Sequence, residues 1–173
     1  DNAIIAWGDG GLEVTDKFKE KFMQTNVHEV RIAINNKCNM SCAHCFYGFK
    51  ETCRPDLTFE QFTKAIDDFV ANGVTQFHFS GKEPFYNDYI FKFTDYLKEK
   101  HPHVRYDAVT NGINVPKFIK QIKEAGFYRI CVSFDDFDGG KTRNYDSSLV
   151  MKLLIENGIK THAFVTCSKA NLN

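Results

Sequence analysis

The most constraining feature of this sequence is an alternation of strand-like and helix-like segments that starts at residue 28. The predicted strands are residues 28–34, 74–79, 105–110, 128–134 and 160–166. The predicted helices lie between them, at residues 59–72, 86–100, 115–125 and 147–157. Strands of this length that alternate with amphipathic helices are typical of β-α-β units, in which neighbouring strands run parallel. The chain is therefore predicted to be an α/β protein with five parallel strands and four intervening helices.

Residues that begin and end helices support this assignment. Thr58 and Gln61 have the spacing of a capping box, in which each side chain bonds the backbone of the other at a helix start. Gly73, Gly126 and Gly158 each follow a predicted helix and precede the next predicted strand. Glycine is favoured there because it adopts the left-handed conformation that ends many helices.

A different pattern precedes the alternation. Two short apolar runs, residues 4–7 and 12–15, flank the sequence Gly8-Asp9-Gly10-Gly11, and this arrangement predicts a β-hairpin. Asp16 is a candidate cap for a short helix that reaches residue 23. We therefore predict an extension over residues 1–27, followed by the main domain over residues 28–173.

Composition limits the kinds of partner that this chain is expected to bind. The 173 residues include 22 Lys and Arg and 22 Asp and Glu, so the formal net charge is zero. A neutral balance argues against a broad nucleic-acid-binding surface or a basic membrane-binding surface. The sequence has no apolar run of transmembrane length and no visible signal peptide. These features predict a cytoplasmic protein.

The cysteines are clustered rather than spread along the chain. Four of the six, at positions 38, 42, 45 and 53, lie within one segment. A secreted disulfide framework would distribute them, so metal binding in a reducing compartment is the favoured interpretation.

The segment from Cys38 to Cys45 has the spacing C-x3-C-x2-C and directly follows the first strand of the alternation. Three close thiolates can hold three irons of a [4Fe–4S] cube and leave the fourth iron open to a small molecule. The alternative is a zinc site in which Cys53 or His44 is the fourth ligand, because a structural metal site normally has a closed shell.

Polar motifs also follow the later strands. Ser80-Gly81-Lys82-Glu83-Pro84 follows the second strand, Thr110-Asn111-Gly112 ends the third, and Ser133-Phe134-Asp135 ends the fourth. Loops at the carboxyl ends of parallel strands gather at one edge of the sheet, which is where α/β proteins bind ligands. The sequence therefore predicts one site at this edge. An ordinary Asn-Gly turn remains the alternative for Asn111.

Taken together, these motifs resemble those of radical S-adenosylmethionine (SAM) enzymes, and the resemblance extends from residue 28 onward. It implies a partial (β/α) TIM-like barrel, of which five of the usual six β/α units are visible, in addition to the N-terminal hairpin. It also implies two cofactors, a [4Fe–4S] cluster and SAM. Lys82 departs from the family motif Gly-Gly-Glu-Pro, because it occupies the position of the second glycine.

The resemblance assigns roles to individual residues. The implied cluster ligands are Cys38, Cys42 and Cys45. The implied SAM-binding residues are His44 against the adenine, Ser80, Gly81, Lys82 and Glu83 around the amino group, Asn111 in the site wall, Ser133 near the ribose or carboxylate, and Arg143 facing the carboxylate. No further catalytic residue is assigned.

The activity implied by the resemblance is reductive cleavage of SAM to a 5′-deoxyadenosyl radical, which then abstracts a hydrogen atom from a substrate. The motifs most resemble the branch of the family that modifies peptides or proteins, while small-molecule and RNA substrates remain open. The electron would come from a donor such as flavodoxin or ferredoxin. The alternative of a different class is a non-catalytic module that binds zinc or an iron–sulfur cluster.

Overall fold

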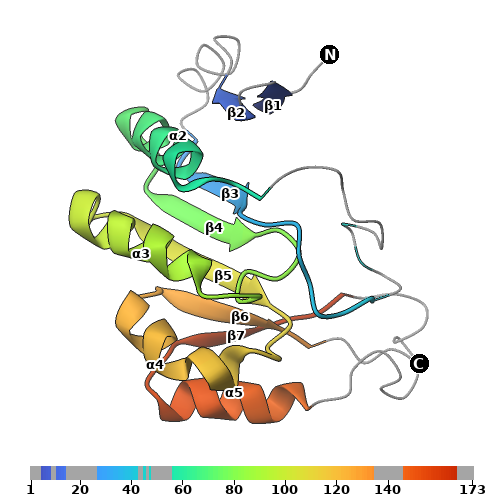
Figure 1. Ribbon diagram of the computed structural model, residues 1–173. Coiled ribbons are helices and arrows are strands. Elements are labelled where there is room, and N and C mark those ends of the chain that lie inside the picture. The colour runs from blue at the N-terminus through green and yellow to red at the C-terminus, as the bar shows by residue number, and fades with distance from the viewer. Residues whose placement is uncertain are drawn as a thin grey trace.

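A five-stranded parallel sheet forms the centre of the protein (Figure 1). The computed structural model describes residues 5–8, 11–14, 27–42, 45, 47, 56–134 and 146–166. The sheet strands are β3 (Glu29–Ala33), β4 (Gln76–Ser80), β5 (Arg105–Thr110), β6 (Arg129–Ser133) and β7 (Thr161–Phe164). They lie in chain order, β3-β4-β5-β6-β7, and each pairs in parallel with the next. This order confirms the predicted parallel sheet.

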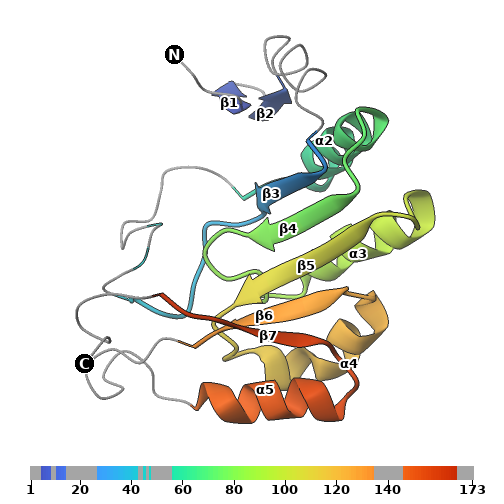
Figure 2. The same cartoon turned by 180° about the vertical axis from the view of Figure 1, so that it is seen from behind.

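Four helices connect these strands: α2 (Phe59–Ala71), α3 (Tyr89–Lys100), α4 (Val115–Ala125) and α5 (Ser147–Glu156). All four lie on one face of the sheet, and the view from behind shows the strands in front of them (Figure 2). This one-sided arrangement is that of a partial (β/α) barrel, whose helices form an outer layer. The predicted fold class is confirmed.

The predicted hairpin is also present. Strands β1 (Ile5–Gly8) and β2 (Gly11–Val14) pair antiparallel, and the register aligns Ile5 with Val14. The helix predicted to reach residue 23 falls outside the described residues. The division into an extension over residues 1–27 and a main domain over residues 28–173 remains a prediction.

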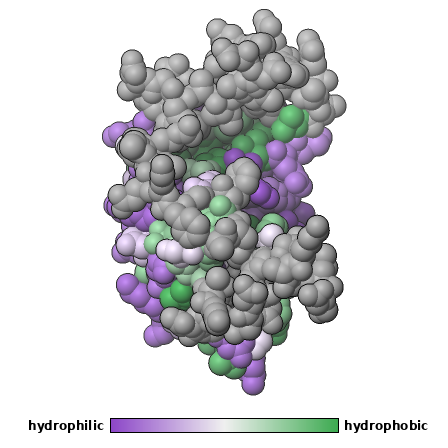
Figure 3. Space-filling model, turned by 90° about the vertical axis from the view of Figure 1, so that its right-hand side faces the viewer, coloured by the Kyte–Doolittle hydropathy of each residue, from purple (hydrophilic) through white to green (hydrophobic). Residues whose placement is uncertain are grey.

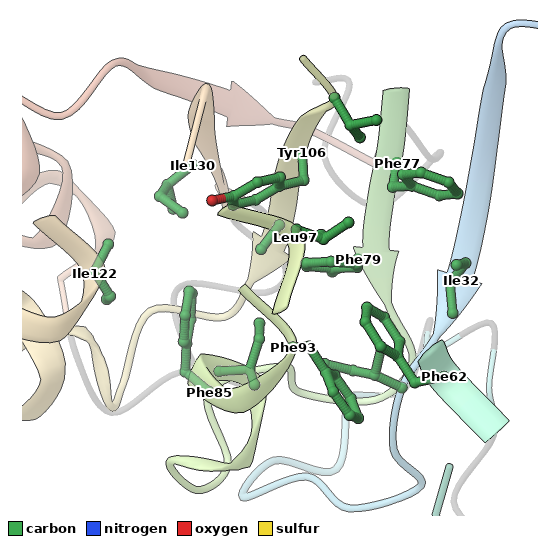
Figure 4. Packing of buried hydrophobic residues seen from close by; sticks show 14 of the residues in the cluster. Ile32, Phe62, Phe77, Phe79, Phe85, Phe93, Leu97, Tyr106, Ile122 and Ile130 are labelled. Atoms are coloured by element: carbon green, nitrogen blue, oxygen red, sulfur yellow. The ribbon is translucent and has the colours of Figure 1, made fainter. Parts of the chain in front are cut away.

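The main hydrophobic core lies between the sheet and the helices and is rich in phenylalanine (Figure 4). On β4, Phe77 and Phe79 are fully buried in this core, while Gln76 and His78 alternate with them and are half-buried. This alternation follows from the period of two in a strand, which places successive side chains on opposite faces. The helix-free face of the sheet is therefore the polar one.

A row of polar and charged side chains crosses this polar face from β3 to β6. Asp107 on β5 is almost completely buried, and its carboxylate lies 2.7 Å from the Nδ1 atom of His78 and 2.8 Å from the Nε atom of Arg129. The Nε2 atom of His78 lies 3.2 Å from Glu29 on β3. Pairing of this kind compensates the cost of removing a carboxylate from water.

Helix boundaries agree with the sequence signals at two positions and differ at a third. Thr58 and Gln61 form the predicted capping box, and Gly126 ends α4 in the left-handed conformation. The second helix, however, begins at Tyr89 and not at residue 86. The amide of Tyr86 donates to the Glu83 carbonyl, and the amide of Tyr89 donates to Asn87, so residues 83–88 form turns.

Within the described part of the chain, none of the helices is long and apolar enough to span a membrane.

Candidate active site

The loops that follow β3, β4 and β5 meet at the carboxyl edge of the sheet (Figure 1). Figure 3 looks onto this edge, where hydrophobic residues are exposed between polar ones. Parallel strands in register bring these loops together, because β3 pairs with β4 and β4 with β5. Three of the sequence motifs therefore lie at one edge, as predicted.

Hydrogen bonds continue the β3–β4 pairing beyond the strand ends. The amide of Ile34 donates to the Ser80 carbonyl at 3.1 Å, and the amide of Glu83 donates to the Lys37 carbonyl at 3.0 Å. The side-chain amide of Asn35 donates to the Glu83 carbonyl at 2.7 Å. These bonds hold the residues just before Cys38 against the Gly-Lys-Glu-Pro loop.

The cysteine loop is also tied at its base. Asp56 accepts a hydrogen bond from the amide of Asn36 at 2.9 Å, and its other carboxylate oxygen lies 3.3 Å from the Lys37 ammonium. Residue 56 thus lies beside residues 36 and 37, so the segment between them starts and ends at the same point of the sheet.

The three cysteines of the motif are half-buried. Cys38 and Cys45 are unbridged thiols, and the amide of Cys45 donates to the Cys42 carbonyl at 3.0 Å, which forms a turn between these two cysteines. Two residues later, the Tyr47 hydroxyl donates to Ser80 Oγ at 3.3 Å. The loop therefore folds back over the end of β4.

The three thiols of this loop are the candidate ligands of a metal cluster. Burial raises the pKa of the Cys38 thiol, hydrogen bonds from Met40 and Asn111 oppose this rise, and the charge of Glu83 adds to it. In the described part of the chain, no three His, Cys, Asp or Glu side chains are gathered closely enough to hold a metal ion. Cysteine ligands are deprotonated, so binding of a metal cluster here would release the thiol protons. Three thiolates from one loop can ligate three of the four irons of a [4Fe–4S] cluster.

The backbone conformation at position 81 can be adopted only by glycine. Its φ is +112°, and a Cβ atom built at this position would lie 2.6 Å from the Asn35 carbonyl oxygen. Both the positive φ and the close approach exclude other residue types. The glycine requirement of this loop thus rests on Gly81, while Lys82, which replaces a glycine of the family motif, is accommodated with its amide 3.4 Å from the Asn35 carbonyl.

The carboxylate of Glu83 is fully buried and joins two loops. Its Oε1 atom accepts from Thr110 Oγ1 at 2.6 Å and from the Phe85 amide at 3.0 Å, and its Oε2 atom accepts from the Asn111 amide at 2.8 Å. Burial raises the pKa of this carboxyl, and the three hydrogen bonds lower it in part. These three hydrogen bonds hold the carboxylate in place within the protein. The role of Glu83 near the amino group of SAM, which the resemblance implies, remains a prediction.

Asn111 lies where the three loops meet. Its side-chain amide donates to Asn39 Oδ1 at 2.8 Å and approaches Cys38 Sγ at 3.6 Å. Asn111 therefore contacts the cysteine loop directly. The sequence did not predict this contact, because Asn39 and Cys38 lie 72 and 73 positions before Asn111.

The remaining predicted site residues are only partly placed. Ser133 is half-buried at the end of β6, and its carbonyl accepts from Ser147 Oγ at 3.2 Å. His44 and Arg143 lie outside the described residues, as does Cys53. Sequence reasoning missed Asp56, and it named Thr110 in the Thr-Asn-Gly motif without giving it a role. The contacts of both residues depend on partners that are distant in sequence.

Comparison with protein families gives one match over most of the chain. The model of the Radical SAM superfamily matches residues 32–168. Among curated proteins, a probable GTP 3′,8-cyclase of Methanosarcina mazei is 36% identical over 119 residues, which are 66% of this chain and 35% of the relative. A GTP 3′,8-cyclase of Clostridium acetobutylicum is 28% identical over 151 residues, which are 85% of this chain and 45% of the relative. The chain thus spans less than half the length of these relatives.

Solved structures show the same fold at low sequence identity. Streptococcus suis SuiB bound to S-adenosylmethionine has a TM-score of 0.67 and 16% identity, and the match covers 86% of this chain and 38% of SuiB. BtrN in complex with AdoMet and 2-DOIA has a TM-score of 0.64 and 16% identity, and the match covers 80% of this chain and 56% of BtrN.

Proposed function

Because this chain belongs to the radical SAM superfamily, we propose that it is the core of an enzyme that cleaves SAM reductively at a [4Fe–4S] cluster. The observation that carries the proposal is the meeting of the cysteine loop with the Gly-Lys-Glu-Pro loop. Hydrogen bonds from the Glu83 and Lys82 amides to the carbonyls of Lys37 and Asn35, and from the Asn35 side chain to the Glu83 carbonyl, join them. The comparisons give no support to the alternative of a zinc module.

Cys38, Cys42 and Cys45 are the residues that would hold the cluster. When bound, the cluster supplies one electron to the sulfonium of SAM, which yields methionine and a 5′-deoxyadenosyl radical. With three protein ligands, one iron of the cluster would lack a protein ligand, and the amino and carboxylate groups of SAM would bind there. The fully buried carboxylate of Glu83 holds the adjoining loops in place for this arrangement.

The SAM-binding roles of the other residues are part of the proposal. The backbone of residues 80–82 presents carbonyl oxygens to the SAM ammonium, and Gly81 permits the close packing of this loop on Asn35. By resemblance to the family, Ser133 would face the ribose or carboxylate of SAM, His44 would pack on the adenine, and Arg143 would pair with the carboxylate. A guanidinium suits a carboxylate because the two groups form parallel hydrogen bonds.

The substrate class that the curated relatives support is a purine nucleotide. The relatives named above are GTP 3′,8-cyclases, whereas the structural neighbours that bind peptides, such as anSMEcpe with bound AdoMet and Cp18Cys peptide at 15% identity, share only the fold. The peptide-modifying branch suggested by the motifs thus has weaker support. A reducing partner such as flavodoxin or ferredoxin supplies the electron.

Anaerobic reconstitution tests the proposal directly. We expect about four irons per chain, and formation of 5′-deoxyadenosine when dithionite and SAM are added. Cys42→Ala should abolish both, while Cys131→Ala, which changes a buried cysteine on β6, should retain both. A colourless protein with one tightly held zinc and no SAM cleavage would overturn the assignment.

The same assay distinguishes the two substrate classes. GTP should increase the formation of 5′-deoxyadenosine, because a bound substrate consumes the radical and commits SAM cleavage. ATP serves as the control for non-specific nucleotide binding. If GTP has no effect and a cysteine-containing peptide stimulates cleavage, the nucleotide assignment is wrong.

A further inference from the structure

The sulfur of Cys38 lies near two N–H donors that belong to different loops. The backbone amide of Met40 lies 3.4 Å from Sγ, and the side-chain amide of Asn111 lies 3.6 Å from it. The first donor belongs to the cysteine loop itself, as is common where a chain wraps around a sulfur. The second reaches across from the loop after β5 and is the unusual one.

The orientation of the Asn111 amide is fixed by its own turn. The amide of Ile113 donates to Asn111 Oδ1 at 3.0 Å, so the oxygen faces the backbone N–H and the Nδ2 group faces the cysteine loop. A flipped amide would place two donors against each other. The Nδ2 group also donates to Asn39 Oδ1 at 2.8 Å, which agrees with this orientation.

The backbone of Asn111 is held by the buried carboxylate. Glu83 Oε2 accepts from the Asn111 amide at 2.8 Å, and Glu83 Oε1 accepts from the neighbouring Thr110 hydroxyl at 2.6 Å. Two hydrogen bonds to one buried carboxylate leave this turn little freedom. The donor that faces Cys38 is thus part of a rigid network.

Donors at a ligating sulfur change the energy of an iron–sulfur cluster. An N–H group stabilises negative charge on sulfur, and the reduced cluster carries one more negative charge than the oxidised cluster. Hydrogen bonds to sulfur are accordingly one of the determinants of cluster reduction potential. Removal of such a donor makes reduction harder.

We propose that Asn111 is a positioning residue that donates an N–H···S hydrogen bond to Cys38 and thereby raises the reduction potential of the cluster. This role differs from contact with SAM, which the sequence motif implied for Asn111. The inference rests on the proposed function, because it requires Cys38 to be a cluster ligand.

The test is a redox titration of the reconstituted cluster without SAM, followed by its visible and electron paramagnetic resonance spectra. Asn111→Leu removes the donor at similar volume. We expect the reduction equilibrium to weaken by about tenfold, which for a one-electron couple corresponds to ~59 mV toward more negative potential. Asn111→Asp keeps the acceptor for Ile113 but places an oxygen beside the sulfur, so its shift should be larger in the same direction.

Asn114→Leu is the matched control. Asn114 belongs to the same turn, but its side-chain amide donates to the carbonyls of Phe85 and Tyr86 and not to a cysteine. Its cluster potential should equal that of the wild type. Circular dichroism identifies any variant that does not fold.

The outcomes separate this inference from the proposed function. A wild-type protein that binds no cluster contradicts the proposed function itself. A wild-type protein that binds the cluster, together with Asn111 variants that fold and leave its potential unchanged, overturns only the inference. An equal shift in Asn114→Leu overturns it too, because any damage to the turn would then suffice.

Discussion

The two halves of the sheet are built differently. The half formed by β3, β4 and β5 with α2 and α3 contains stacked aromatic rings, and the rings of Phe62 and Phe93 lie 4.0 Å apart at an interplanar angle of 10°. The half formed by β6, β7 and α5 exposes large apolar side chains: Leu149 is 64% exposed and Ile155 is 60% exposed. The close contacts of the candidate site belong to the first half.

The candidate site lies on the half of the sheet that has the more closely packed core. Glu83, Asn111 and the base of the cysteine loop all lie on strand ends of the aromatic half, whose core fixes the strands that carry them. The other half contributes Ser133 at the end of β6. A site whose parts must hold a fixed geometry is expected to lie on the better-packed elements.

The largest expected effect is that of Phe62→Ala. Phe62 is completely buried and packs on both Phe93 and Phe79. Loss of a buried phenylalanine ring leaves a cavity, so we expect the free energy of unfolding to fall by about 3–5 kcal/mol. Urea denaturation followed by circular dichroism measures it. A loss as small as that of an exposed residue would mean that the aromatic half is not the stabilising one.

Gly81→Ala is expected to rank second, and Gly158→Ala is its control in the other half. Both glycines have positive φ, but an added Cβ meets the Asn35 carbonyl only at Gly81 and nothing within 4 Å at Gly158. We expect about 1–2 kcal/mol for Gly158→Ala from backbone strain alone. Gly81→Ala should cost about 1–3 kcal/mol more from the clash. Equal losses in thermal or urea unfolding would refute the close approach.

Asp107→Asn tests the connection between the two halves. The carboxylate is 1% exposed and pairs with His78 on one side and Arg129 on the other. We expect a loss of about 2 kcal/mol in the free energy of unfolding, since both charge-assisted hydrogen bonds weaken. Asp68→Asn, which weakens the exposed pair with Lys64, is the control and should cost less than about 0.5 kcal/mol. Similar costs for the two variants would contradict a structural role of the charged row.

The pH dependence of the free energy of unfolding tests whether burial raises the pKa of Glu83. Burial raises the pKa of Glu83 above its ordinary value of 4.5 in the folded state. Its contribution to stability is therefore fully present below the unfolded pKa and is lost as the pH rises through the folded pKa, at up to about 1.4 kcal/mol per pH unit. Glu83→Gln should flatten this slope in denaturation curves above pH 4.5. An unchanged slope would show that other groups cause it.

The smallest expected effect is that of Phe164→Ala. Phe164 is 45% exposed on β7. Substitution of a surface residue away from special features changes stability by about 0.5 kcal/mol or less. The same urea titration as for Phe62→Ala provides the comparison. If Phe164→Ala costs as much as Phe62→Ala, the contrast between the two halves is wrong.

Most of the fold was predictable because local periodicity determines it. The strand from Arg105 to Thr110 and the helix from Val115 to Ala125 occur at the residues that the sequence pattern predicts. The start of α3 was not predicted correctly, because Glu83 and Asn87 hold the residues before Tyr89 in turns. A side chain that stabilises a turn competes with helix formation in a way that apolar periodicity does not record.

The sequence predicted at which edge of the sheet these motifs lie, but it did not predict their contacts. The motifs identified Glu83 and Asn111 as site residues, and both lie at the predicted edge. Their partners Thr110 and Cys38 are 27 and 73 positions away, respectively, and such pairings depend on strand register rather than on local sequence. Asp107 shows the same limit, since its pairing with Arg129 required the order of the strands.

The tie between Asp56 and residues 36–37 has an evolutionary consequence. Both ends of the segment between residues 37 and 56 are held at one point, so added residues within it cost little loop-closure entropy and do not strain the sheet. Insertions between Cys45 and Asp56 are therefore expected to leave the three implied cluster ligands and the strand ends beneath them in place.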